Sequence, residues 1–168
     1  MPSGPSWYAS HGNSLEAWYQ QANSIMWAAG RLIHVYARPD KRGPSLQQRR
    51  DALLASILLR VFVLECLLKA LWLAEGKLLV VGNRFRGIPG VNNHDLVAMA
   101  STLGVALNDE EIETLRRLRR FGEIGRYPIT SRMVTDAPDR EWRATDSSHF
   151  ARVALRIKGL IRERKEGV

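Results

Sequence analysis

The sequence predicts an all-α protein, an antiparallel bundle of four to five helices. Apolar residues recur at spacings of three and four in five segments, which is the pattern of helices with one buried face. Residues that cap helices open these segments, and short connections separate them, as in antiparallel bundles. The alternation of apolar and polar residues that strands require is nearly absent.

The first helix is expected to begin at Asn13-Ser14-Leu15-Glu16, which has the pattern of a capping box. The turn at Arg38-Pro39-Asp40 ends it. Its apolar face consists of Leu15, Trp18, Tyr19, Ala22, Ile25, Met26, Ala29, Ile33 and Tyr36.

The second helix is expected to begin at Pro44-Ser45, where Gln48 completes another capping box, and to end at Gly76. It carries the longest apolar stretch of the chain, from Leu53 to Leu73, so we expect it at the centre of the bundle. Three charged residues interrupt this stretch, which excludes a membrane span of roughly 20 uncharged residues. These residues are Arg60, Glu65 and Lys69.

Three shorter helices are expected after a glycine-rich loop over 77–93, which contains a short extended piece at 78–81. The third, 94–103, follows the capping residues Asn92-Asn93. The fourth begins after Asn108 and ends at Gly122 or Gly125, and 129–143 form a polar loop. Thr145 or Asp146 caps the last helix, which reaches about residue 164. We expect one domain over 1–168, with a core over about 13–164 and loose termini.

The charge balance of the chain predicts a polyanionic partner. The net charge is +8, and most of the 25 basic residues are arginine. Such a balance is typical of proteins that bind nucleic acid, although the arginine content of a GC-rich genome is an alternative explanation. Cys66 is the only cysteine, which excludes an internal disulfide. We expect a cytoplasmic protein with no cofactor, no metal and no membrane partner.

A polar network is predicted around Glu65, which falls on an apolar stripe of the second helix. One interpretation is a local pair with Lys69, and the other is a buried network that docks further elements. His94 and Asp95 open the third helix, either as capping residues or with His94 in contact with Glu65 or Arg126. The stripe consists of Leu54, Leu58, Val61, Leu68 and Trp72.

Several motifs of this chain resemble those of HEPN domains (higher eukaryotes and prokaryotes nucleotide-binding). The segment 63–71, Val-Leu-Glu-Cys-Leu-Leu-Lys-Ala-Leu, resembles the Glu-x-x-x-Lys-Ala helix of these domains. His94-Asp95-Leu96 resembles the HDL that opens a later helix, and the helix over 111–118 followed by Arg126-Tyr127-Pro128 resembles the RYP ending. The resemblance covers roughly residues 45–160.

This resemblance implies a helical bundle, usually a homodimer, with a role related to RNA or nucleotides in prokaryotic defence or toxin–antitoxin systems. Active members are metal-independent endoribonucleases with an Arg-x4-6-His motif, and two copies of the motif usually meet across the dimer. The arginine stabilises charge on the phosphate and the histidine moves protons. The resemblance also implies a nucleotidyltransferase-like antitoxin as a partner.

The ribonuclease motif has one match, Arg143 and His149. Of the four histidines, only His149 has an arginine at the required distance. A chance match is the alternative, with Arg143 in a loop and His149 on the surface of the last helix. If the chain is an enzyme, these two residues are the predicted catalytic pair.

A basic run on the fourth helix is a second candidate for phosphate binding. The alternative is a solvated face, on which Arg117 could pair with Glu113, four residues before it. The run consists of Arg116, Arg117, Arg119 and Arg120, and Arg84 and Arg86 could extend it. The five tryptophans could stack on bases, but at helical spacing they more often belong to the core.

The leading hypothesis is therefore an RNA- or nucleotide-associated module of a defence or toxin system, with or without ribonuclease activity. The rival is a non-catalytic module in which Glu65, His94 and Arg126 fix the bundle. Its apolar faces would then bind a second copy or a nucleotidyltransferase-like partner. A sensor of free nucleotides is a third hypothesis.

Overall fold

The computed structural model describes residues 6–37, 43–126 and 142–167, apart from the side chains of 124–126. The described part forms six helices and one two-stranded sheet, which confirms the all-α bundle. The helices are α1 Trp7–Gly12, α2 Leu15–Ala37, α3 Leu46–Ala74, α4 Leu96–Thr102, α5 Asp109–Arg126 and α6 Asp146–Glu166. The strands are β1 Val80–Val81 and β2 Arg84–Phe85.

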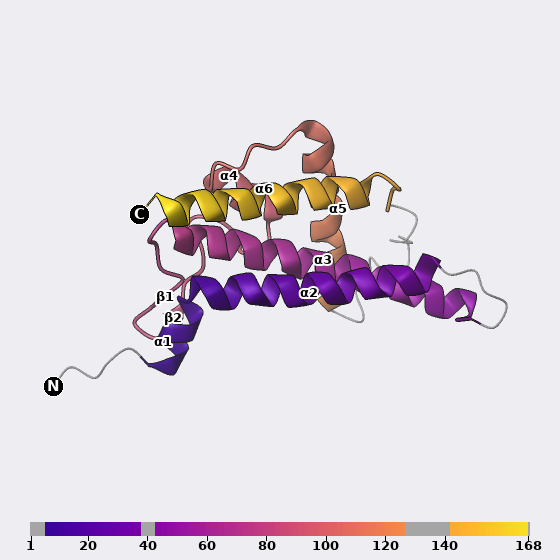
Figure 1. The fold of residues 1–168 in the computed structure, drawn as a ribbon, viewed down its shortest axis with the longest axis horizontal. Coiled ribbons are helices and arrows are strands. Elements are labelled where there is room, and N and C mark those ends of the chain that lie inside the picture. The colour runs from indigo at the N-terminus through magenta and orange to yellow at the C-terminus, as the bar shows by residue number, and fades with distance from the viewer. Residues whose placement is uncertain (1–5, 38–42, 127–141, 168) are drawn as a thin grey trace.

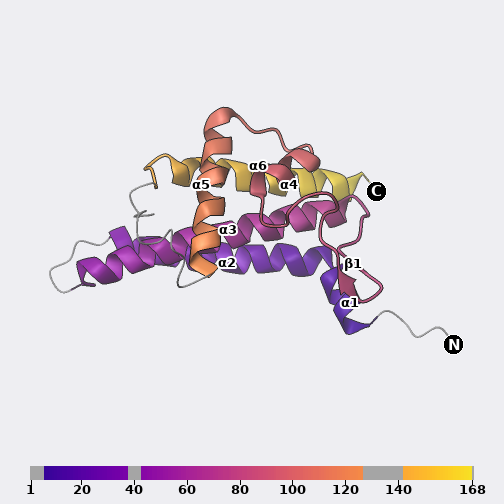
Figure 2. The ribbon, with the colours of Figure 1, turned by 180° about the vertical axis from the view of Figure 1, so that it is seen from behind.

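Helix α3 lies at the centre of the molecule, as the apolar stretch predicted. It contacts α2, α4, α5 and α6, and α2, α3 and α6 lie side by side along the long axis (Figure 1). Helix α5 crosses the other long helices at a steep angle, which is clearest from behind (Figure 2). Helix α2 runs antiparallel to α3, whereas α6 runs in the same direction as α3 (Figures 1 and 2).

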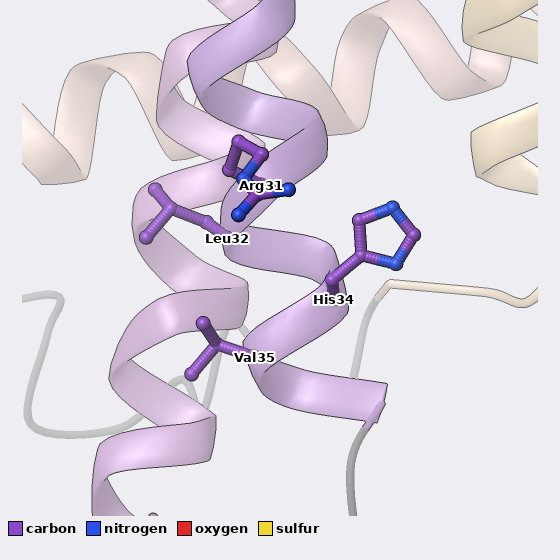
Figure 3. A pocket seen from close by; sticks show the side chains of 4 residues that line it. All are labelled: Arg31, Leu32, His34 and Val35. Atoms are coloured by element: carbon purple, nitrogen blue, oxygen red, sulfur yellow. The ribbon is translucent and has the colours of Figure 1, made fainter.

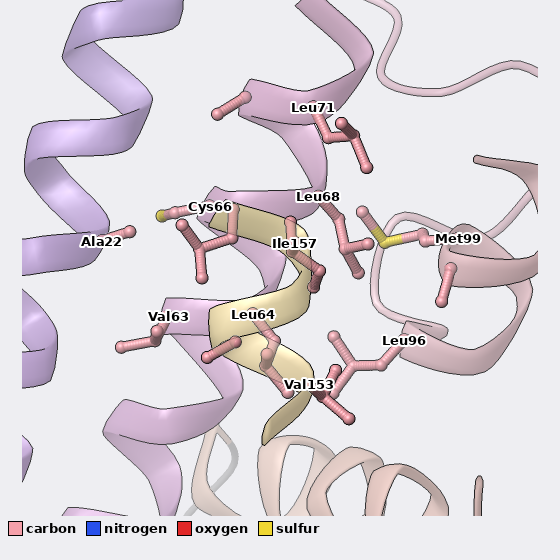
Figure 4. Close-up of a cluster of buried hydrophobic side chains, with 14 of the residues drawn as sticks. Ala22, Val63, Leu64, Cys66, Leu68, Leu71, Leu96, Met99, Val153 and Ile157 are labelled. Atoms are coloured by element: carbon pink, nitrogen blue, oxygen red, sulfur yellow. The ribbon is translucent and has the colours of Figure 1, made fainter. Parts of the chain in front are cut away.

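The core surrounds α3 on nearly all sides. Figure 4 shows Leu64 and Leu68 of α3 on the side of α4 and α6, whereas Cys66 lies on the side of Ala22 in α2. Because α3 is covered in every direction, it shows no single apolar face. Its neighbours α5 and α6 keep the amphipathic pattern of helices with one solvated side.

Helix α1 lies within the region that we expected to be a loose terminus. Six residues are too few to show a helical period, so the sequence pattern could not reveal it. Asn13 joins this helix to the sheet, because its side-chain oxygen accepts hydrogen bonds from the Leu79 and Val80 amides at 2.8 Å. Asn13 therefore does not cap α2, and the Ser14 hydroxyl accepts the Ala17 amide instead.

The predicted caps of α3, α4 and α5 agree with the structure in two cases out of three, and at α6 Thr145 occupies the N-cap position without a side-chain hydrogen bond to the helix. Ser45 and Gln48 form the expected capping box of α3, and Asn108 caps α5 together with Glu111. The prediction that Asn92-Asn93 cap α4 was wrong, since Asp95 accepts the Ala98 amide at 3.0 Å. The two asparagines order the preceding loop, where Asn93 accepts the Ile88 amide.

The end of the α2–α3 hairpin extends beyond the start of α6 (Figure 1). It carries large apolar side chains that the described residues leave exposed, and Trp27, nearer the middle of α2, is 70% exposed. The others are Val35, Tyr36 and Leu46, and we call these four residues the hairpin-tip surface. Among the described helices, none is long and apolar enough to cross a membrane.

The crossing of α5 over α3 requires a glycine at position 122. A Cβ atom at Gly122 would lie 2.9 Å from Cγ1 of Val61, whereas a Cβ at Gly159 of α6 meets nothing within 4 Å. Gly122→Ala should therefore lower the free energy of unfolding by about 1–3 kcal/mol through overpacking. Gly159→Ala is the matched control and should raise it by up to about 1 kcal/mol through helix propensity. Urea unfolding measures both, and a stable Gly122→Ala variant would contradict the close crossing.

Candidate active site

A cluster of four polar side chains lies between α5 and the first turn of α6. Arg117 of α5 donates two hydrogen bonds to the carboxylate of Asp146 in α6, from Nε at 3.0 Å and from Nη2 at 2.5 Å. Thr114 Oγ1 lies 2.8 Å from Asp146 Oδ1 and 3.0 Å from Nδ1 of His149. Asp146 and His149 are one helical turn apart, so both face Thr114.

The hydrogen bonds of Thr114 determine which nitrogen of His149 carries a proton. An ionised carboxylate only accepts hydrogen bonds, so the single hydroxyl proton of Thr114 goes to Asp146. The hydroxyl oxygen therefore accepts from its other neighbours, which are Arg117 and Nδ1 of His149. Nδ1 must then be protonated, and in the neutral ring Nε2 has a free lone pair.

Asp146 stays ionised in this buried position. Burial by itself raises the pKa of its carboxyl, but hydrogen bonds from Arg117, the Arg143 amide and Thr114, together with the charge of Arg117, outweigh burial. The pKa of Asp146 therefore lies below its ordinary value. The Arg143 amide donates to Asp146 Oδ2 at 2.9 Å, so the same carboxylate positions the backbone that carries Arg143.

His149 and Arg143 line one cavity of about 220 Å³ beside this cluster. His149 is only 7% exposed, so the interpretation as a surface histidine was wrong. Its Nε2 lies 3.4 Å from Oε2 of Glu110, whose side chain is 75% exposed. The remaining lining residues are Asp109, Glu113, Arg117 and Thr145.

The sequence analysis did not identify Thr114 or Glu110, and it treated Asp146 only as a capping residue. Thr114 and Glu110 lie on α5, more than 30 positions before His149, and only the packing of α5 on α6 brings them together. A local signal existed for Asp146, because Asp-x-x-His on a helix places both side chains on one face. Chemically, the cavity offers a histidine nitrogen for proton transfer next to a guanidinium that can hold a phosphate.

The predicted basic run on α5 is largely committed to ion pairs. Arg117 does not pair with Glu113, which instead binds Arg116 at 2.5 Å, and Arg119 binds Asp95 and Glu123. Arg120 is exposed and also takes part in an interaction. Arg84 and Arg86 are exposed at the sheet, which lies with α1 at one end of the molecule and away from α5 (Figures 1 and 2). The six arginines therefore form no continuous patch in the described part.

The expected contact between Glu65 and His94 is present. Nδ1 of His94 lies 3.0 Å from Oε1 of Glu65, and Lys69 Nζ lies 4.0 Å from Oε2. Lys69 also lies 4.9 Å from the centre of the Trp18 ring, which links α2 to this network. Both interpretations of Glu65 thus apply together. The side chain of Arg126 and all of Tyr127 lie outside the described residues.

A second buried carboxylate, Glu111, fastens α5 to α6. It is 1% exposed and binds Arg156 through both oxygens, at 2.8 and 3.1 Å. Burial by itself raises the pKa of Glu111, but the hydrogen bonds from Arg156 and the Asn108 amide and the charges of Arg156 and Arg152 outweigh it. The pKa therefore lies below its ordinary value. This pair holds together the two helices that carry the cavity.

Other parts of the described surface bring together fewer reactive groups. A larger cavity of about 300 Å³ lies along α2, lined by Arg31, Leu32, His34 and Val35 (Figure 3). None of the described residues that line it carries a carboxylate. Burial raises the pKa of the Cys66 thiol to about 11, which disfavours the thiolate form that acts as a nucleophile. Within the described residues, no group of histidine, cysteine and acidic side chains could hold a metal ion.

Comparison of the chain with models of protein families, with curated proteins and with solved structures finds no match in any of the three. The resemblance to HEPN domains therefore rests on the motifs of the chain itself.

The buried pair of Asp146 and Arg117 predicts a specific loss of stability in acid. The carboxyl of Asp146 has a lower pKa in the folded protein than in the unfolded chain, where it is about 3.9. Its ionised form therefore stabilises the fold at pH values above about 3.9, and this stabilisation is lost as the pH falls through the folded-state pKa. Asp146→Asn should cost on the order of 3 kcal/mol at pH 7 and flatten the decline in unfolding free energy below about pH 4. Asp51→Asn, an exposed substitution, should retain the wild-type decline. Urea unfolding across pH measures this, and equal slopes for Asp146→Asn and wild type would contradict it.

Proposed function

We propose that this chain is an HEPN-like, RNA-associated module that acts as a metal-independent endoribonuclease through Arg143 and His149. The observation that carries the proposal is the cavity that both residues line, in which Thr114 and Asp146 fix the proton of His149. A buried histidine with one defined tautomer is the arrangement that general acid–base catalysis requires. The net charge of +8 favours a polyanionic substrate.

In the proposed reaction, RNA places a phosphodiester between His149 and Arg143. His149 exchanges a proton with the substrate through Nε2, because Nδ1 is held by Thr114. The guanidinium of Arg143 stabilises the negative charge that develops on the phosphate. Because both residues line one cavity of a single chain, catalysis does not depend on the partner subunit of the proposed homodimer.

The biological setting of the proposal follows from the HEPN resemblance. The chain would belong to a prokaryotic defence or toxin–antitoxin system in the cytoplasm, and a nucleotidyltransferase-like antitoxin would restrain it. An active ribonuclease should then stop growth when it is overexpressed alone, whereas the His149→Ala variant should not.

The decisive experiment is gel-resolved cleavage of total RNA by the purified protein in EDTA. Wild type should cleave, and Arg143→Ala and His149→Ala should each slow cleavage by at least about 100-fold, since each removes a group that acts in the transition state. Arg162→Ala, which removes an exposed arginine of α6 outside the cavity, is the control and should cleave like wild type. Intact RNA after incubation with folded wild type would refute the ribonuclease, and equal cleavage by all variants would refute the residue assignment.

A second candidate, a non-catalytic interaction module, is favoured by the hairpin-tip surface. The four large apolar side chains of this surface are exposed, and exposed apolar patches are typical of protein interfaces. The network of Glu65, Lys69 and His94 would then serve to fix the bundle that presents this surface.

This candidate predicts that the oligomeric state depends on the hairpin tip. Trp27→Ser and Leu46→Ser should weaken self-association by at least about tenfold, because each removes a large apolar side chain from the interface. Leu155→Ser changes a leucine of similar exposure on α6 and should leave association unchanged. Light scattering coupled to size exclusion over a concentration series measures this. A wild-type monomer at all concentrations, or equal effects of the three variants, would contradict a homodimer through the tip.

A further inference from the structure

We infer that Glu110 is the second catalytic residue of this cavity, the base that accepts the proton of the RNA 2′-hydroxyl, while His149 is the acid. This inference rests on the proposed ribonuclease function. The contact that carries it is the 3.4 Å approach of Glu110 Oε2 to Nε2 of His149. The motif of arginine and histidine alone leaves one of the two proton transfers of RNA cleavage without a residue in the same chain.

Glu110 lies on the exposed side of the cavity. It belongs to the first turn of α5, and its side chain is 75% exposed. His149, in contrast, is buried and held by Thr114. A substrate can therefore enter between the two groups by displacing the exposed glutamate side chain without disturbing the histidine.

The neighbouring acids are less suited to this role. Glu113 binds Arg116 at 2.5 Å, and Asp146 is held by Arg117, Thr114 and the Arg143 amide. Asp109 also lines the cavity, but the contact with His149 is made by Glu110. Among the described carboxylates around the cavity, Glu110 is thus the one that lies within ion-pair distance of Nε2, at 3.4 Å.

The proximity of Glu110 and His149 suits the protonation state that the proposed reaction needs. In the reactive state that we propose, the carboxylate is ionised and the imidazolium carries a proton on each nitrogen. Nδ1 donates to Thr114, so only the Nε2 proton can be transferred. The base is therefore without its proton and the acid has one before the substrate arrives.

The step balances without any further reactant. Glu110 takes the proton of the 2′-hydroxyl, and the 2′-oxygen forms a bond to phosphorus. The bond between phosphorus and the 5′-oxygen breaks, and this oxygen takes the Nε2 proton of His149. The products are a 2′,3′-cyclic phosphate and a 5′-hydroxyl. The guanidiniums of Arg143 and Arg117, which line the same cavity, offset the charge of the phosphate against the carboxylates.

Two consequences follow, one for the substrate and one for mixtures of inactive variants. DNA lacks the 2′-hydroxyl and cannot be cleaved by this route. Since acid, base and arginine belong to one chain, mixing inactive Glu110→Gln protein with inactive His149→Ala protein should restore no activity.

The experiment separates the two roles with a leaving group that needs no acid. We would locate a cleavage site of the wild type in an RNA and replace the bridging 5′-oxygen there with sulfur, because a thiolate leaves without protonation. Glu110→Gln should cleave both RNAs at least about 100-fold more slowly than wild type. His149→Ala should be equally slow on normal RNA but close to wild type on the sulfur-containing RNA. Mass spectrometry of the wild-type products should show the 2′,3′-cyclic phosphate.

Matched variants keep the test decisive. Glu123→Gln removes the same charge from an exposed residue of α5 outside the cavity and should cleave both RNAs like wild type. His149→Gln retains a side-chain amide that can bind Thr114, and it replaces His149→Ala if that variant unfolds.

Glu110→Gln with wild-type rates on both RNAs would overturn the inference and leave the proposed ribonuclease intact. Rescue of Glu110→Gln by sulfur, with no rescue of His149→Ala, would reverse the two roles. Intact RNA with wild type would overturn both proposals.

Discussion

The buried polar side chains of the central helix α3 must find partners, because residues 52–74 of this helix are covered on nearly all sides. Three of them bind different neighbouring elements. Ser56 donates to the Ala29 carbonyl of α2 at 2.9 Å, and Arg60 donates to Ser147 of α6 at 2.8 Å. Glu65 binds His94, at the loop that leads into α4. The polar positions of one helix thus specify how the surrounding elements dock, whereas apolar packing alone would accept several arrangements.

The contact between Arg60 of α3 and Ser147 of α6 determines where the cavity lies. Arg60 is buried beneath the start of α6, where its guanidinium lies 5.2 Å from the centre of the Phe150 ring and 5.3 Å from that of Trp142. This fixes the first turn of α6 against α3, and the pairs Arg117–Asp146 and Arg156–Glu111 then fix α5 against α6. His149 is consequently carried by a rigid corner between three helices, which is the kind of support that a catalytic geometry needs.

The sequence predicted those features that depend on neighbours within one helical turn. The capping boxes at Ser45 and Asn108 and the central position of α3 are of this kind. Prediction from the sequence failed where a side chain had two plausible partners. Arg117 could pair locally with Glu113, but the buried carboxylate of Asp146 on another helix binds it more strongly, since a pair shielded from water is less screened. For the same reason no spacing rule could reveal that Thr114 lies between Asp146 and His149.

The same competition for partners changes how the charge of the chain should be interpreted. The arginines of α5 and α6 that pair with carboxylates serve to hold helices together, so the formal charge of +8 overstates the cations available to a polyanion. Arg143 differs from them, because its backbone amide is held by Asp146 while its guanidinium has no ion pair among the described residues. An arginine that is fixed at its backbone and whose guanidinium pairs with no carboxylate of the described part can bind a phosphate without breaking a contact within that part. This difference favours the cavity over the basic run of α5 as the place where RNA would be held.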